Sequence, residues 1–331
     1  LSGRCDECPE EAANIALTVF GILAGAVSIV VFIKLTLSDA GKVDAADGIK
    51  TILLGYVQMI ILLTTFPIEW PAVITAVFQV GGAVTVLGQH LVNLKCLVPS
   101  YSDADVFFTQ SAIWALLPLF LVLACTGTWV LLDRAKCRGG VERVWAKVRA
   151  SCVALLYLLY PTLCMQAFGV FACRAVCDGD GATYLRADLS EECYAGRHAL
   201  FVGLVGVPML LAYVLGLPVA AAVTVHRMQL RAVLTNRHLA KMKGHLTWGL
   251  FYSSFKRRMW WWELTGVLRK ATLALIGVFG ANLELMQVHL TVLLVLGVTL
   301  LTALVQPFGG KRGRTLLWLE LLALASTWLT L

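Results

Sequence analysis

The sequence predicts an all-α fold, a polytopic membrane helix bundle of about eight transmembrane helices plus one re-entrant or interfacial helix. The chain is 59% hydrophobic and only 14% charged, whereas a soluble domain carries roughly a quarter charged residues. Backbone groups in lipid must bond internally, so apolar runs of about 20 residues are expected to be helices. No period of two, which would indicate strands, is sustained. The uncharged runs are 12–33, 51–68, 70–94, 106–132, 150–173, 198–226 and 285–310.

The seven uncharged runs, together with two apolar segments near the carboxyl end that contain charged residues, predict the helices of the chain. Run 70–94 contains Pro71 and the Gly81–Gly82 pair, and a crossing there would move every later connection to the opposite side. We therefore expect a re-entrant or outer-surface helix at 70–94. Residues 1–12 are predicted to be the tail of a cysteine-rich extracellular domain, and 13–331 the transmembrane bundle. The expected crossings are about 13–34, 50–67, 107–132, 151–171, 198–223, 263–281, 286–306 and 315–331.

The basic residues predict which ends of the helices face the cell interior. With the amino end outside, 22 of the 27 Lys and Arg residues fall on the inner side, as the positive-inside rule demands. The exceptions are Arg4, Lys95, Arg174, Arg186 and Arg197. The basic segment 226–262 is then cytosolic, and the loop 172–197 is extracellular.

The cysteines support the same orientation. Six of them are placed outside, an even number that suits disulfides in an oxidising compartment. The pairing of the cysteine at 96 with the three in the 172–197 loop stays open, since four cysteines permit three pairings. The disulfide candidates are Cys5, Cys8, Cys96, Cys173, Cys177 and Cys193.

The 172–197 loop is also acidic. Its carboxylates could place oxygens around calcium, but the spacing of an EF-hand is missing, so a solvated acidic loop is the favoured interpretation. The acids are Asp178, Asp180, Asp188, Glu191 and Glu192.

The stretch "KRRMWWWE" (256–263) predicts an inner membrane surface. Clustered cations attract anionic lipid, and indole rings favour headgroup depth. We expect an anionic-lipid interface with an aromatic belt here; simple anchoring without a specific lipid is the alternative. The interface residues are Lys256, Arg257, Arg258, Trp260, Trp261 and Trp262.

Arg269 and Lys270 lie about 9–10 Å further along the same helix, at 1.5 Å per residue. A cation at that depth is costly unless it is paired or extends back to the surface. The last crossing contains one acid, Glu320, at a similar depth. We therefore predict an ion pair between Glu320 and Arg269 or Lys270 that joins the sixth and eighth crossings. In the alternative, both cations extend to the inner surface.

The short outer turn "ANLELMQVH" (281–289) offers a candidate mouth. Glu284 lies at its tip, and Gln287 and His289 open the following crossing. A carboxylate between two linked helices could attract cations toward a pore; a solvated turn is the alternative. No catalytic constellation, metal-ligand set or cofactor motif is visible, so we expect no enzyme activity, no cofactor and no metal.

From Lys50 onward the order of features resembles the TRP-like multi-span domains at the carboxyl ends of large algal and protist surface proteins, which often follow cysteine-rich, ephrin-receptor-like repeats. The matching pieces include "GIKTILLGYVQMI", "CDGDGATYLRADLSEECY", "WWWELTGVLRKATLALIGVF" and "LWLELLALAS". The fungal flavin-carrier and polycystin-like group is more loosely similar. The resemblance implies a cation-channel-type or force-sensing subunit that couples a large ectodomain to the membrane.

A non-conducting receptor or anchor for an extracellular assembly is the alternative function. We expect a plasma-membrane or ciliary location with the amino terminus outside. The expected partners are anionic lipids of the inner leaflet, the protein's own ectodomain or an extracellular assembly, and further copies in an oligomer. No nucleic-acid partner is expected.

Overall fold

The computed structural model describes most of the chain. The described residues are 11–38, 45–64, 66, 102–136, 141–175, 183–234, 245–248, 251, 254–283, 285–310 and 312–331. The segment expected to be re-entrant, 70–94, lies outside them, as does the expected cysteine-rich tail through residue 10.

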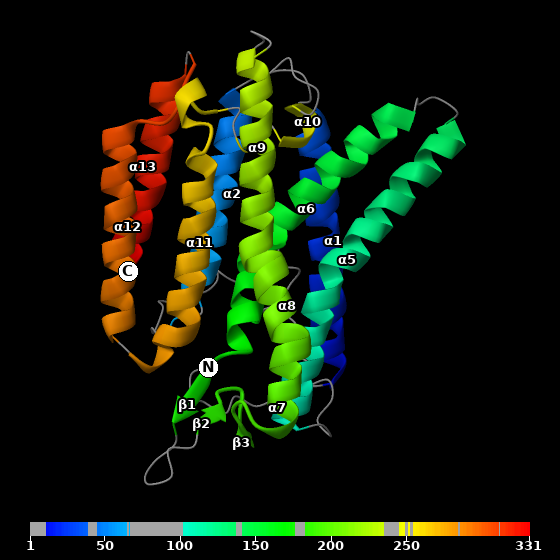
Figure 1. The fold of residues 1–331 in the computed structure, drawn as a ribbon, viewed down its shortest axis with the longest axis vertical. Helices are drawn as coiled ribbons and strands as arrows, with labels where there is room; N and C mark the ends of the chain where they lie inside the picture. Colours follow the sequence, from blue (N-terminus) through cyan, green and yellow to red (C-terminus); the bar gives the residue numbers. More distant parts are fainter. Residues whose placement is uncertain are drawn as a thin grey trace.

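Long helices lie side by side and form the bundle (Figure 1). They occur at the positions where the apolar runs predict them. From α7 to α9 the chain forms one continuous rod that includes two π-helical stretches, η1 and η2. The helices are α1 (Glu11–Ser38), α2 (Ala45–Leu63), α5 (Asp103–Lys136), α6 (Val141–Gly169), α7 (Gly196–Phe201), η1 (Val202–Gly206), α8 (Val207–Met209), η2 (Leu210–Gly216), α9 (Leu217–Leu234), α10 (His245–Trp248), η5 (Arg257–Met259), α11 (Trp262–Phe279), η6 (Gly280–Asn282), α12 (Leu285–Val305) and α13 (Gly313–Thr330).

Five of the described helical segments are long and apolar enough to cross a membrane. They lie in α1, α5, α6, the α7–α9 rod and α12. α2 is apolar but shorter over Gly48–Leu63. α11 and α13 are 18 residues long and contain charges within their apolar sequence. The fold is thus a mostly helical bundle of the membrane type.

A small antiparallel sheet, which the sequence did not predict, connects α6 to the α7–α9 rod. Its strands pair in the order β1 (Cys173–Ala175), β2 (Thr183–Leu185) and β3 (Asp188–Glu192). Strands of three to five residues are too short to display a sustained period of two. The sheet lies at one end of the bundle, and the last turn of α5 and the first turn of α6 lie at the opposite end (Figure 1).

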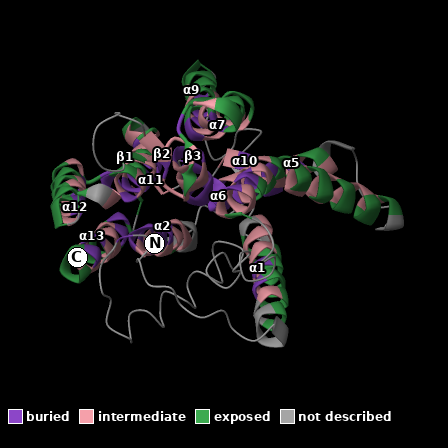
Figure 2. Ribbon diagram, turned by 90° about the horizontal axis from the view of Figure 1, so that it is seen from below, coloured by how far each residue is buried: buried purple, intermediate pink, exposed green. Residues whose placement is uncertain are grey.

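α6 is the central helix of the bundle. In its apolar window 72% of the residues are buried, against 11–17% in the other four long segments. Figure 2 shows buried residues gathered on α6, α11 and α2, whereas α5 and α12 carry mostly exposed ones. Side chains on α6 are therefore the ones best placed to contact several helices at once.

Prolines inside two helices leave backbone carbonyls that side chains of other helices then bond. Pro161 has no N–H for the carbonyl of Tyr157, one turn earlier, and Gln58 Nε2 on α2 donates to that oxygen at 3.2 Å. Pro218 likewise leaves the carbonyl of Val214, which accepts a hydrogen bond from the Tyr160 hydroxyl at 3.2 Å. Both contacts satisfy groups that would otherwise lie unpaired in an apolar interior.

We predict that Gln58→Leu lowers the free energy of unfolding by about 1–3 kcal/mol, because the Tyr157 carbonyl loses its donor. The loss should shrink in a Pro161→Ala background, where the new N–H can bond that carbonyl. Thermal unfolding in detergent measures both values, with Thr128→Val on an exposed face as the control. Equal losses in the two backgrounds would contradict this explanation.

Candidate functional site

Helix α11 turns three charged side chains into the protein. Glu263, Arg269 and Lys270 have exposed fractions of 7%, 8% and 1%. Residues seven apart lie on one face of a helix, so Glu263 and Lys270 share the face that packs toward α6. Buried charges must be paired and hydrogen-bonded to be stable. The neighbouring helices have to supply those partners.

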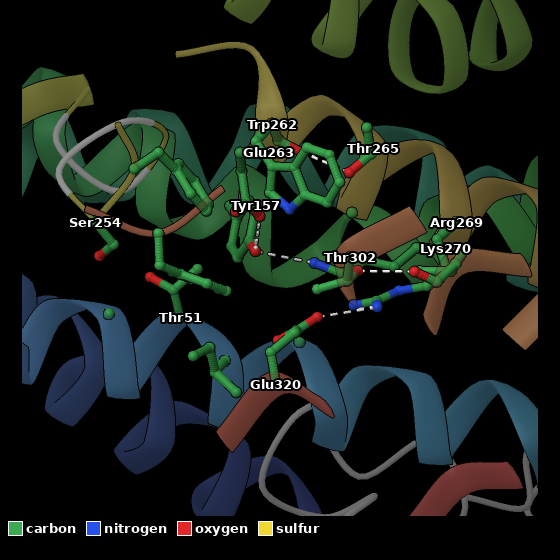
Figure 3. Close-up of a pocket in the computed structure, with 17 residues that line it drawn as sticks. Thr51, Tyr157, Ser254, Trp262, Glu263, Thr265, Arg269, Lys270, Thr302 and Glu320 are labelled. Atoms are coloured by element: carbon green, nitrogen blue, oxygen red, sulfur yellow. Dashed lines mark hydrogen bonds and ion pairs between the residues drawn. The ribbon is translucent and has the colours of Figure 1, made fainter. Parts of the chain in front are cut away.

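Tyr157 of α6 joins Lys270 to Glu263. The ammonium Nζ of Lys270 donates to the Tyr157 hydroxyl at 3.0 Å, and that hydroxyl donates to Glu263 Oε1 at 2.6 Å. Lys270 Nζ also lies 4.2 Å from the centroid of the Tyr157 ring, within the range of a cation–π contact. Figure 3 shows the three side chains converging.

Arg269 makes the predicted contact with the last helix. Its Nη1 lies 3.1 Å from Glu320 Oε1 on α13, and the two side chains are 8% and 14% exposed. Of the two cations considered for this pair, Arg269 is therefore the partner of Glu320, and Lys270 bonds to Tyr157 instead. The sequence offered no signal for Tyr157, because its position in "LLYLLY" resembles ordinary apolar packing.

The Lys270–Tyr157–Glu263 bridge and the Arg269–Glu320 pair line a common cavity of about 40 Å³. A water molecule needs roughly 10–15 Å³ of such space, so the cavity has room for water. The Nε atom of Arg269 is buried and has no hydrogen-bond partner among the described residues. Four hydroxyl side chains complete the polar lining: Thr51, Ser254, Thr265 and Thr302. We call the five side chains Tyr157, Glu263, Arg269, Lys270 and Glu320, with this cavity, the charged cluster.

A short backbone pairing lies against the charged cluster at the cation-rich end of the bundle, which is the end opposite the sheet. Lys256 N donates to Pro307 O at 2.8 Å, and Gly309 N donates to Ser254 O at 3.0 Å. These bonds join the segment before α11 to the turn before α13. At Gly48 on α2, a Cβ atom would lie 2.8 Å from Leu316 Cδ1 and from Ser254 Oγ, so any larger residue there would displace these two side chains.

The predicted lipid interface is only partly exposed. Lys256 and Arg258 are exposed, and Trp261 is 39% exposed. Trp262 is buried at 6%, and the half-buried ring of Trp260 lies 5.2 Å from the ring of His226. Trp260 and Trp261 precede α11, which begins at Trp262, so the three rings do not share one helix face and differ in exposure. The side chain of Arg257 lies outside the described part.

Two of the three candidates for the outer mouth, Gln287 and His289, lie in the described part of the chain and face different sides of α12. Gln287 is fully buried and donates to the carbonyls of Ile276 and Gly277 at 3.1 and 3.3 Å. His289 is exposed, and its ring Nδ1 lies 2.7 Å from Leu285 O of its own helix. Residues i and i+2 face nearly opposite sides of a helix, so Gln287 joins α12 to α11 while His289 points away. Glu284 lies outside the described residues.

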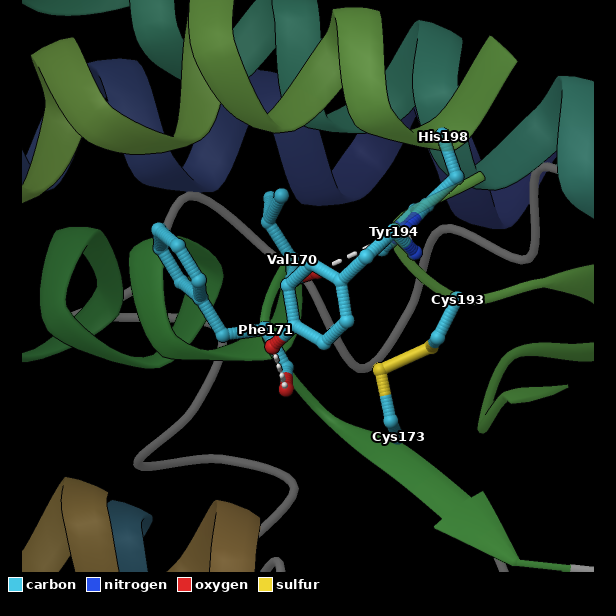
Figure 4. The surroundings of a disulfide bond; sticks show 6 residues. All are labelled: Val170, Phe171, Cys173, Cys193, Tyr194 and His198. Atoms are coloured by element: carbon cyan, nitrogen blue, oxygen red, sulfur yellow. Dashed lines mark hydrogen bonds between the residues drawn. A yellow bond between two sulfur atoms is a disulfide. The ribbon is translucent and has the colours of Figure 1, made fainter. Parts of the chain in front are cut away.

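The sheet between α6 and α7 contains one disulfide, Cys173–Cys193. Figure 4 shows it beside His198. The buried His198 ring lies with Nε2 3.1 Å from Val170 O, and its Nδ1 accepts a bond from Tyr194 N at 2.9 Å. The other candidates, at positions 5, 8, 96 and 177, lie outside the described residues. Of the three partners that the sequence left open for Cys173, the structure has Cys193.

Acidic residues of the sheet bond to helices. Asp188 Oδ2 accepts a hydrogen bond from Ala104 N at 2.9 Å in the first turn of α5. Hydrogen bonds from the Ser190 backbone and hydroxyl, with that from Ala104 and the charge of Arg197, hold the pKa of Asp188 below its ordinary value. Arg197 pairs with both Glu191 and Asp105. The carboxylates of Asp188 and Glu191 therefore make contacts that hold the sheet to neighbouring helices. Asp178 and Asp180 lie outside the described residues.

The sheet also reaches α11 directly. Arg186, in the turn between β2 and β3, donates through Nη1 to Val278 O at 2.8 Å. Val278 lies in the last turn of α11, where backbone carbonyls lack helical partners. One end of α11 is thereby bonded to the disulfide-linked sheet, while its other end carries the charged cluster.

We predict that Tyr157→Phe lowers the free energy of unfolding by about 1–3 kcal/mol, since Lys270 and Glu263 lose their shared partner. The effect should be smaller in a Lys270→Met background, in which half of the bridge is already absent. Tyr184→Phe, in the sheet, is the matched control, and unfolding in detergent is the measurement. Additive losses from Tyr157→Phe and Lys270→Met would argue against the bridge.

The charged cluster has room for water and pairs each of its two cations with a group on another helix or on the same helix through Tyr157. In the described part of the chain no group of three His, Cys, Asp or Glu side chains could hold a metal ion. Comparison with protein-family models, curated proteins and solved structures found no match for this chain.

Proposed function

We propose that this protein is a TRP-like integral membrane protein, a cation-channel-type or force-sensing subunit that couples an ectodomain to the membrane. The observation that carries the proposal is the charged cluster: four ionisable side chains and a tyrosine lie inside an apolar bundle around a water-sized cavity. Ionisable residues at such depth are costly and mark functional sites by default. A bundle that served only as an anchor would be more stable with apolar residues there.

In this proposal the chain crosses the membrane about eight times, with the amino terminus outside. α2, α11 and α13 then cross together with the five long apolar segments. The cation-rich connections face the cytosol at a plasma or ciliary membrane, and the disulfide-linked sheet faces outward. The helix ends that lead into the cation-rich connections lie at the end of the bundle opposite the sheet (Figure 1), which supports this orientation through the positive-inside rule.

The proposed working part is α11. Movement of the outer sheet would be transmitted through the Arg186–Val278 contact to α11, which would shift Arg269 and Lys270 relative to Glu320 and Tyr157. Exchange of partners by these charges would change the access of water to the cavity. In a low-dielectric interior, each unpaired charge is costly, so the cluster favours discrete closed and open arrangements.

A second function, a non-conducting receptor or anchor for an extracellular assembly, is favoured by a different observation. The cluster contains two acids and two bases, so its formal charges balance, and Arg269 and Glu320 are in direct contact. A balanced, bonded cluster also suits a rigid bundle that does not open.

Reconstitution into liposomes that contain anionic lipid separates the two functions. The channel proposal predicts cation currents or calcium influx under voltage or membrane tension. Lys270→Met should change the open probability by about tenfold or more, since 1.4 kcal/mol corresponds to tenfold. Lys34→Met, the same substitution at an exposed site on α1, is the matched control, and Tyr157→Phe is a second, milder cluster variant.

Absence of current from folded protein under both stimuli would reject the channel and support the anchor. Currents that respond equally to Lys270→Met and Lys34→Met would show that conduction does not depend on the charged cluster.

A further inference from the structure

A second cavity lies between α6, the α9 part of the rod, α10 and α11. It has a volume of about 200 Å³ and a lining that is almost wholly apolar. Trp248 and Phe251 line one part of it, and Ala220 and Ala221 of α9 line another. Its other lining residues are Val153, Leu156, Tyr157, Tyr160, Leu217, Pro218 and Val267.

The size and lining of this cavity select an apolar occupant. An apolar cavity of roughly 150 Å³ stays dry and accepts benzene, and this one is larger. An empty void of this kind destabilises a protein in proportion to its volume. The hydroxyl of Tyr160 is engaged by Val214 O and that of Tyr157 by Glu263, so neither tyrosine offers a free donor. The occupant is therefore a hydrocarbon group.

The surroundings identify the source of that hydrocarbon. The cavity is partly open, and Ala220 on its rim is exposed, on a rod whose apolar segment is long enough to cross a membrane. Exposed cations lie near this cavity, toward the end of the bundle opposite the sheet. One of them, Arg227, is six residues after Ala221, or about 9 Å further along the helix. Lys256 and Arg258 precede α11 at the same end and are also exposed. Charge of this sign attracts anionic headgroups.

We propose that the apolar cavity binds one acyl chain of an anionic phospholipid from the leaflet at the cation-rich end, with its headgroup near Arg227 and Arg258. Tyr157 gives this site a connection to the charged cluster. Its ring lines the apolar cavity, while its hydroxyl bridges Lys270 and Glu263. Occupancy by the chain would hold the Tyr157 ring in place and stabilise the bridge. This regulatory consequence rests on the proposed function; the binding itself does not.

Photolabelling tests the site directly. Full-length protein in liposomes is exposed to phosphatidylglycerol or phosphatidylcholine that carries a photoreactive group in its acyl chain, and labelled peptides are mapped by mass spectrometry. We expect phosphatidylglycerol to label the segments 217–221 and 248–251, in competition with unlabelled phosphatidylglycerol. Ala221→Leu, which fills the cavity, should abolish most of this labelling. Ala222→Leu, the same change at a neighbour outside the lining, should retain it.

The cations provide a second, independent measurement. Arg227→Gln and Arg258→Gln should each weaken apparent binding roughly fivefold, since a basic residue near the surface contributes about 1 kcal/mol. Equal labelling of Ala221→Leu and Ala222→Leu would overturn the cavity site. So would labelling of the unaltered protein that unlabelled phosphatidylglycerol does not reduce. Equal labelling by the two lipids would overturn the role of the anionic headgroup. None of these outcomes requires conduction, so they distinguish this inference from the channel proposal.

Discussion

A charged side chain that leaves water must find a counter-charge or a hydrogen-bond partner within the protein, and the geometry of α11 depends on that requirement. The cost of an unpaired buried ion is several kcal/mol or more. Lys270 meets it through Tyr157 and Glu263, and Arg269 meets it through Glu320. These contacts set the rotation of α11 about its axis and its distance from α6 and α13. A bundle held by apolar packing alone would tolerate other rotations.

The same requirement explains features around the cluster. Pro161 lacks the N–H that would bond the Tyr157 carbonyl. Gln58 of α2 bonds that carbonyl instead, which joins α2 to α6 beside Tyr157. Gly48 permits α13 to approach α2 closely, which brings Glu320 within reach of Arg269. At the far end, Arg186 bonds the last turn of α11. One helix thus connects a disulfide-linked sheet to a buried charged cluster, and the Tyr157 ring extends that connection to the apolar cavity.

Much of this arrangement follows from the sequence, and the rest depends on tertiary geometry. Apolar runs predicted where the helices lie, because segment length and charge are local properties. The Arg269–Glu320 contact was predictable because depth along a helix can be counted in residues. The Tyr157 bridge was not, since it depends on how α6 is rotated against α11. Rotation of α12 about its axis also turns Gln287 inward, which the sequence did not indicate. Trp262 is buried, whereas Trp261, which precedes α11, is exposed.

The central claim is that protein partners, not extension into the lipid headgroups, stabilise the cations of α11. Exchange of the charges in Arg269→Glu, Glu320→Arg and the double variant tests it most directly, with unfolding measured in lipid–detergent micelles. Each single variant places two like charges together and should lose several kcal/mol. The double variant restores an opposite pair and should recover a large part of that loss. A double variant no more stable than either single one would contradict the account.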